Sequence, residues 1–277
     1  MKNWKQFVQH RLALISLFYL VIISIMAVAA PLVTPSSYEE QNIAERLQGP
    51  SLKHWMGTDN LGRDLYSRII YGARMSLAVG ITTAVFSLIL GTFTGSIAGY
   101  WGGRMDHLIM GIVDIFYMFP VLLMAILLML LLGRGFTGIF IALGLATWMS
   151  QARIVRGLTL LNREMAYVEA AKATGITDLR IIFRHIIPNL LGPIIVSLTF
   201  QIPSNIMAES FLSFIGLGLQ PPFSSWGTLA NEGFRAIKSY PHLIIFPGLV
   251  LFITMLAFSY LGDGLRDLLD PKSKKTI

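Results

Sequence analysis

Long apolar stretches separated by short polar segments dominate this chain of 277 residues. Six of them reach the roughly 17–25 residues that an α-helix needs to cross the hydrocarbon core of a bilayer. They run from Leu12 to Val33, Met75 to Gly103, Leu108 to Leu132, Gly135 to Ala152, Ile186 to Ile215 and Ser239 to Gly262. The pattern predicts an all-α fold, a polytopic membrane bundle of about six transmembrane helices.

Composition agrees with a membrane protein. Hydrophobic residues make up 54% of the chain, charged residues 13%, and the mean hydropathy is +0.64, whereas soluble domains carry about 25% charged residues. The chain has no cysteine, which excludes a disulfide framework and a thiolate metal site. Its five histidines are scattered without ligand spacing, so we expect neither a metal site nor a cofactor.

The net charge of +7 is interpreted as a topology signal rather than a nucleic-acid footprint, because Lys and Arg mark cytoplasmic loops. With the N-terminus in the cytoplasm, the inner segments hold 14 of the 22 basic residues. This bias predicts a multi-pass protein of a prokaryotic cytoplasmic membrane with both termini in the cytoplasm.

We expect two parts of one membrane domain. Residues 1–74 contain the first helix and an extracytoplasmic loop, and residues 75–277 form the core permease domain. The first span resembles a secretory signal, since Ala27-Val28-Ala29 follows a basic start and an apolar run. Its length and the nearby Pro31 favour a retained helix.

The inner loop at 153–189 is too long for a simple bilayer turn. Glu164 to Thr174 is rich in Ala and predicts a helix, which Gly175 breaks. Thr177-Asp178 then predicts the start of a second helix. The segment is therefore predicted to be a helix-turn-helix hairpin on the cytoplasmic surface.

The two hairpin helices have different characters. The second has an apolar face, formed by Ile181, Ile182, Ile186 and Ile187, and Pro188 is expected to stop it. The first carries small residues that allow close approach to a groove of another protein, with Glu169 and Lys172 available at the rim. Spacing alone does not distinguish such a docking helix from a solvated surface helix.

The fifth apolar stretch carries a polar residue every four positions: Ser197, Gln201, Asn205, Glu209 and Ser213. Such neighbours share one helix face. Polar groups in a membrane normally face the bundle or a wet cavity. We favour the interpretation that this stripe lines the cargo path, with hydrogen bonding between helices as the alternative.

Three other features are predicted to be structural. Glycine recurs every four residues in the second stretch, at Gly91, Gly95, Gly99 and Gly103, which predicts a close helix–helix contact. Asp114 lies inside the third stretch. Two interpretations are open: an ion pair with a basic residue such as Arg104 or Arg153, or a position near the membrane interface. The outer segment from Gly57 to Asp64 is predicted to be a turn capped by Thr58 or Asp59.

The inner loop resembles a known family. Glu169-Ala170-Ala171, three further residues, Gly175 and then Pro188 resemble the EAA loop of ABC importer permeases. That general pattern has an aliphatic residue where His185 stands and Leu where Ile187 stands. The peptide and nickel branch of the family has the histidine, followed by Pro188-Asn189.

Three more segments resemble that branch, in the same order. They are Gly57-Thr58-Asp59-Asn60-Leu61-Gly62-Arg63-Asp64; Ser213-Phe214-Ile215-Gly216-Leu217-Gly218 with Pro221-Pro222 and Ser225-Trp226-Gly227; and Gly262-Asp263-Gly264-Leu265-Arg266-Asp267 before Asp270-Pro271. The resemblance covers nearly the whole chain. The chain resembles the C-type permease subunit of oligopeptide, dipeptide or nickel importers.

The resemblance implies the type I permease fold and a complex with a second permease subunit, two ATPase subunits and an extracytoplasmic binding protein. It also implies that the ATPase contacts the coupling residues Glu169, Ala170, Ala171, Gly175 and Pro188. The chain has no Gly-Lys pair and hence no Walker A loop. We therefore expect a non-catalytic subunit whose ATP is hydrolysed by a partner.

Two other classes fit the residues less well. An ion-coupled secondary transporter predicts paired ionisable residues near mid-membrane and inverted repeats, but only Glu209 and Asp114 are candidates. A membrane-embedded enzyme predicts a cluster such as His-Glu-x-x-His, which is absent from the sequence. By resemblance, the region from Ser213 to Gly227 favours peptide over nickel as cargo, although residue chemistry does not identify the cargo.

Overall fold

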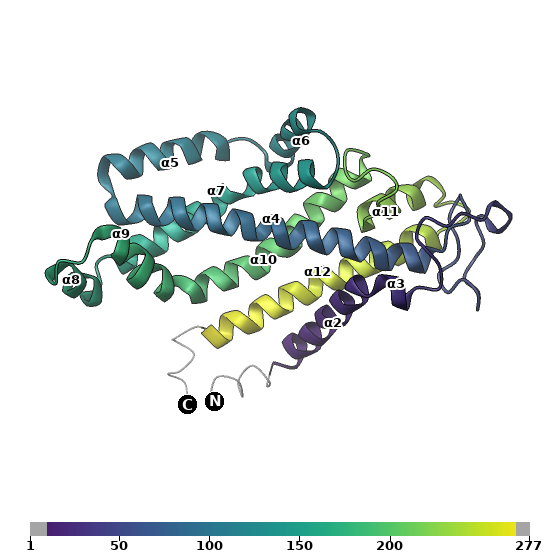
Figure 1. Ribbon diagram of the computed structural model, residues 1–277, viewed down its shortest axis with the longest axis horizontal. Coiled ribbons are helices and arrows are strands. Elements are labelled where there is room, and N and C mark those ends of the chain that lie inside the picture. The colour runs from purple at the N-terminus through teal and green to yellow at the C-terminus, as the bar shows by residue number, and fades with distance from the viewer. Residues whose placement is uncertain (1–9, 270–277) are drawn as a thin grey trace.

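The protein is almost entirely helical, and the computed structural model describes residues 10–269 of it. Its long helices run along the longest axis of the molecule (Figure 1). Apart from one isolated β-bridge, the described residues contain no strand, so the predicted all-α class is confirmed. In chain order the elements are α2 (Arg11–Val28), α3 (Ala30–Val33), the 3-10 turn η1 (Ile43–Glu45), α4 (Leu65–Trp101), α5 (Gly103–Tyr117), α6 (Val121–Leu132), α7 (Phe136–Asn162), α8 (Ala166–Ala173), α9 (Asp178–Ile181), the π-helical turn η2 (Ile182–Ile186), α10 (Ile187–Phe214), α11 (Trp226–Arg235) and α12 (His242–Leu269).

Five helical segments are long and apolar enough to cross a membrane: α2, α4, α7, the segment from α9 through α10, and α12. The pair α5 and α6 makes six if it is one broken span. This number agrees with the six apolar stretches of the sequence.

The third predicted span, Leu108 to Leu132, is wrong as a single helix. The axes of α5 and α6 differ by 88°. A proline has no backbone N–H and disfavours helical geometry in the residue before it, so α5 ends before Pro120. Pro120 itself has a ψ of 126° and precedes the first residue of α6. Hydropathy does not reveal this break, since the residues on both sides of it are apolar.

The second span starts ten residues earlier than its charge-free stretch. The carboxylate of Asp64 caps α4 by accepting a hydrogen bond from the Ser67 backbone N–H at 2.8 Å. The first turns of α4 therefore carry Arg68 and Arg74, two charges that had marked this segment as a loop.

The helices α4 and α7 pack with their backbones in close contact along the predicted glycine face. A Cβ atom on Gly95 would lie 2.3 Å from the carbonyl oxygen of Ala152, and one on Gly99 would lie 2.7 Å from that of Arg156. Gly91 meets α7 in the same way. Gly103, the fourth glycine of the repeat, begins α5 and faces open space. Three of the four glycines therefore form the contact.

Replacing Gly95 with Ala is expected to destabilise the protein by about 1–3 kcal/mol, because the added methyl group forces the two backbones apart. The matched control is Gly111→Ala, since a Cβ atom there meets nothing within 4 Å. Thermal unfolding of the purified protein measures both. Equal melting temperatures for the two variants would contradict the close contact.

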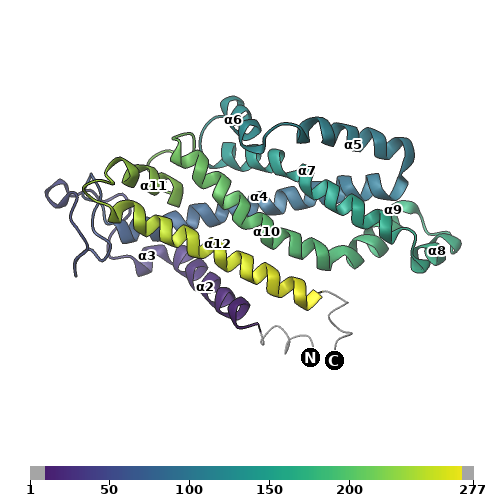
Figure 2. The ribbon, with the colours of Figure 1, turned by 180° about the vertical axis from the view of Figure 1, so that it is seen from behind.

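The start of α2 and the end of α12 are the ends of these helices that point toward α8 and away from α11 (Figure 1). His10 Nε2 lies 3.1 Å from Asp267 Oδ2, which joins the start of α2 to the end of α12. The loop before α4 and the short helix α11 lie at the opposite end (Figure 2).

Candidate functional site

The predicted hairpin is built from α8, a tight turn and α9. Gly175 has a φ of +75°, a left-handed conformation that glycine adopts without a steric cost. Its N–H donates to the Lys172 carbonyl at 3.0 Å, and the N–H of Ile176 donates to the Ala171 carbonyl at 3.3 Å. These bonds end α8 in the manner of a glycine C-cap, and α9 begins at Asp178 as expected.

The helix α8 has a buried face and an exposed face. Val168 and Ala171 are 0% and 6% exposed and pack on the isoleucine cluster of α9 and η2. Glu169, Ala170 and Lys172 are exposed. The motif is therefore divided: Ala171 packs inward, while Glu169 and Ala170 form a surface that another protein could approach closely.

Pro188 does not stop the second hairpin helix, contrary to expectation. α9, η2 and α10 form one continuous helical segment up to Phe214. The π-helical turn ends at Ile186, two residues before Pro188, which occupies the first turn of α10, a position that tolerates its missing N–H. The predicted apolar face is confirmed, since Ile181, Ile182 and Ile186 are fully buried.

A second connection joins the hairpin to α4. The Tyr100 hydroxyl donates to Asp178 Oδ1 at 2.6 Å. The Lys172 ammonium lies 5.0 Å from the centre of the Tyr100 ring, within cation–π range. The hairpin is thus connected to two long helices, directly to α10 and through Tyr100 to α4. No local signal marks Tyr100, because the contact joins segments 78 residues apart.

The polar stripe of α10 faces other helices. Ser197 donates to Gln151 Oε1 of α7 at 3.0 Å. Asn205 and Glu209 are 1% and 0% exposed, and Gln201 is half-buried. The bond of Ser197 is the hydrogen bonding between helices that the sequence left as the alternative, whereas Gln201 Oε1 and Asn205 Nδ2 have no hydrogen-bond partner among the described residues. The assignment of the stripe to the cargo path stays a prediction.

Glu209 is surrounded by hydroxyl groups. Its carboxyl group accepts hydrogen bonds from Ser213 at 2.7 Å, Ser76 at 3.2 Å and Ser210 at 3.4 Å. Ser76 belongs to α4 and also accepts from the Trp226 backbone N–H at the start of α11, at 3.2 Å. The carboxyl group therefore joins α10, α4 and α11 through one network.

Replacing Glu209 with Ala is expected to lower stability by about 1–3 kcal/mol, because buried hydroxyl groups lose their acceptor. Uptake per folded complex separates the two interpretations of the stripe, because an unchanged value indicates hydrogen bonding between helices. The control is Ser204→Ala on the exposed side of α10, where the hydroxyl bonds only within its own helix. Thermal unfolding and uptake are measured together, and a changed cargo preference per folded complex would favour the path instead.

Asp114 pairs with Arg153, one of the two partners that the sequence left open. Arg153 Nη2 lies 2.5 Å from Asp114 Oδ1, and its guanidinium lies 3.8 Å from the centre of the Tyr117 ring. Arg156 donates to both carboxylate oxygens of Asp106 at 2.5 and 2.6 Å. The two ion pairs join α5 to α7.

The outer motif forms the predicted turn. Asp59 Oδ1 accepts from the backbone N–H groups of Leu61 and Arg63 at 2.8 and 3.0 Å. Gly57 and Gly62 have φ values of +84° and +72°, and a Cβ atom on Gly62 would meet a backbone oxygen at 1.8 Å. The turn therefore depends on glycine at these positions.

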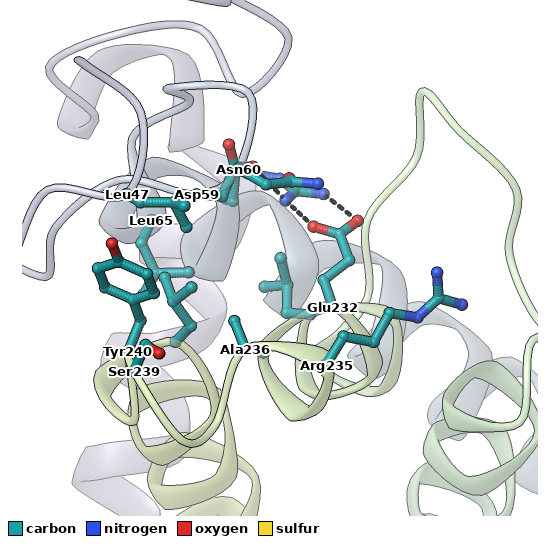
Figure 3. Close-up of a pocket in the computed structure, with 13 residues that line it drawn as sticks. Leu47, Asp59, Asn60, Leu65, Glu232, Arg235, Ala236, Ser239 and Tyr240 are labelled. Carbon is teal, nitrogen blue, oxygen red and sulfur yellow. Dashed lines mark hydrogen bonds and ion pairs between the residues drawn. The ribbon is translucent and has the colours of Figure 1, made fainter. Parts of the chain in front are cut away.

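A buried ion cluster connects this turn to α11 (Figure 3). The Arg68 side chain is 3% exposed and pairs with Asp59 Oδ2 at 2.6 Å and with Glu232 Oε1 at 3.0 Å. Arg63 Nε lies 2.7 Å from the same oxygen of Asp59. Asp59, Arg68 and Glu232 line a cavity of about 240 Å³, and the cluster holds three separate segments together at the end of the molecule opposite α8 (Figure 1).

Residues 87–275 match the family described as the binding-protein-dependent transport system inner membrane component. The chain belongs to this family. In addition, residues 2–50 of the permease match the N-terminal transmembrane domain of oligopeptide transport permease C. Membership confirms the prediction of a multi-pass inner-membrane transport subunit rather than an enzyme.

Several curated relatives of this permease match almost its whole length. The dipeptide transport system permease protein DppC of Bacillus subtilis is 45% identical over 98% of this chain and 85% of the relative. The oligopeptide transport system permease protein OppC of the same organism is 43% identical over 98% of this chain and 90% of the relative. The glutathione transport system permease protein GsiD of Pectobacterium atrosepticum is 40% identical over 98% of this chain and 90% of the relative.

Solved structures agree on the fold of the permease. An inward-facing structure of the MetNI methionine ABC transporter matches with a TM-score of 0.61 at 17% identity, over 73% of this chain and 96% of that one. An amino acid ABC transporter matches with a TM-score of 0.55 at 19% identity, over 73% of this chain and 94% of that one. The predicted ABC importer permease fold is confirmed.

Proposed function

We propose that this permease forms one half of the channel of an ATP-driven importer that carries dipeptides or oligopeptides into the cytoplasm. Its relatives are named for dipeptide, oligopeptide and glutathione transport, and glutathione is itself a short peptide. The complete importer contains a second permease subunit, two ATPase subunits and an extracytoplasmic binding protein.

In this proposal α8 is the contact with the ATPase, and it faces the cytoplasm together with both termini. The support comes from the structure of the hairpin. One face of α8 packs on its own subunit through Val168 and Ala171, while the other exposes Glu169 and small residues. The start of α2 and the end of α12 lie beside each other, at the helix ends that point toward α8 (Figure 1).

The mechanism follows from the connections of the hairpin. When the ATPase subunits close on ATP, α8 moves with them. The fully buried Ile181 and Ile182 transmit this movement to the continuous α10, and the bond between Tyr100 and Asp178 transmits it to α4. The membrane helices then alternate between inward-open and outward-open states. This permease itself carries out no hydrolysis.

The test is uptake by the full complex reconstituted in vesicles with its binding protein. We expect accumulation of a labelled dipeptide that requires ATP and every subunit. Accumulation of nickel in place of peptide would overturn the cargo, and peptide uptake that follows an ion gradient without ATPase subunits would overturn the mechanism. Limited proteolysis at the hairpin from the cytoplasmic side tests the orientation.

A further inference from the structure

A groove between α7, α10 and α12 has no role in the proposed coupling of the hairpin to the membrane helices, although Ser197 of the polar stripe is among its lining residues. It has a volume of about 590 Å³, within the range of about 300–1,000 Å³ that is typical of small-ligand sites. Figure 2 shows α12 beside α10 along this part of the molecule. The lining is mainly apolar, and its residues are Ile154, Pro193, Val196, Ser197, Phe200, Arg266 and Leu269.

Arg266 supplies the only charge among these lining residues. Its side chain is exposed, and within residues 10–269 no carboxylate forms an ion pair with it. It belongs to the segment from Gly262 to Asp267, whose role the coupling mechanism does not explain. The groove therefore combines an apolar wall with a single available cation.

The level of Arg266 in the membrane follows from its neighbours. Arg11 precedes the charge-free stretch of the first span, and the adjacent His10 lies 3.1 Å from Asp267. Arg266 is next to Asp267 and so lies at the same boundary, where lipid headgroups are found. Phe200 lies beside Gly262, one helical turn or about 6 Å deeper.

We propose that this groove binds an anionic phospholipid of the inner leaflet, with the phosphate on Arg266 and an acyl chain along Val196 and Phe200. Basic side chains between transmembrane helices on the cytoplasmic side favour such headgroups. A peptide fits the groove less well, because a peptide carries an ammonium as well as a carboxylate and the lining offers no acidic partner.

The test uses the complete importer, purified in detergent and titrated with phosphatidylglycerol or phosphatidylcholine, with bound lipid counted by native mass spectrometry. We expect saturable binding of phosphatidylglycerol. Arg266→Gln should weaken it about fivefold, the effect of one basic group near an anionic surface. Arg266→Lys should keep most of the binding, and Val196→Trp, which fills the groove without a charge change, should abolish it.

Arg11→Gln is the matched control, because it removes one exposed cation at the same membrane level outside the groove. It should bind lipid as the wild type does. The proposal is overturned if Arg266→Gln binds like the wild type, or if Arg11→Gln loses as much lipid, which would indicate general surface attraction. Displacement of the lipid by a dipeptide would assign the groove to cargo instead.

Discussion

A Glu169→Lys variant should lose ATP-driven uptake by about tenfold or more while it enters the membrane at the normal level. Reversal of a charge at a protein interface costs at least about 1.4 kcal/mol, which is tenfold in an equilibrium constant. Glu169 lies on the exposed face of α8 and has no partner on the described part of its own subunit that the substitution would disturb. The expected loss is therefore one of contact with the ATPase and not of folding.

The control for Glu169 is Glu164→Lys. Glu164 precedes α8, its side chain is 76% exposed, and its nearest cation, Arg163, is 3.8 Å away. The same charge reversal there should leave uptake near normal. ATPase activity and peptide uptake are measured on the same preparation, and equal losses in both variants would contradict a specific contact at Glu169.

Gly175→Val tests the same hairpin through its backbone. A Cβ atom at Gly175 has open space around it, so a side chain there meets no steric clash. The free-energy cost of the substitution comes from the φ of +75°, which is unfavourable by about 1–2 kcal/mol for residues other than glycine. The turn should distort and uptake should fall, with the membrane helices inserted as before. Undiminished uptake in this variant would count against a coupling role for the turn.

Replacing Arg68 with Met should destabilise the permease by about 3–5 kcal/mol, the cost of breaking a buried ion pair from one side. The substitution removes the more deeply buried of the two cations that bridge Asp59 and Glu232, and it leaves Arg63 alone to pair with both carboxylates. The outer loop, α4 and α11 would lose their common contact. Thermal unfolding and the yield of monodisperse protein are the measurements.

Arg235→Gln is the control for Arg68. Arg235 lines the same cavity, but its side chain is exposed and extends away from the cluster (Figure 3). Its replacement should leave the melting temperature unchanged, since exposed charges contribute little to stability. If Arg68→Met unfolds at no lower a temperature than Arg235→Gln, the ion cluster is not what holds the loop before α4, α4 and α11 together.

Patterns within single helices were predicted well from the residues alone. The three glycines that contact α7 were visible as a four-residue repeat because one helix face alone determines that spacing. The buried face of Ile181, Ile182 and Ile186 was visible for the same reason. The break of the third span was not, since Pro120 lies inside a continuous apolar stretch.

Contacts between distant segments needed the folded structure. The pairs Arg68–Glu232 and Tyr100–Asp178 join residues 164 and 78 positions apart, and nothing near either residue indicates its partner. For Asp114 the sequence left two basic partners open, and the packing of α5 on α7 selected Arg153. The rotation and register of packed helices decide such pairs.

The apolar lengths, the bias of basic residues and the motif around Glu169 were sufficient for the membrane class, the family and the hairpin, because each depends on residues that are close in the chain. Whether a polar side chain on α10 faces the cargo or another helix depends on the neighbours that fold around it. Glu209 is fully enclosed, whereas Ser197 on the same helix lines an open groove. Tertiary packing alone made that difference, because burial is a property of the assembled helices.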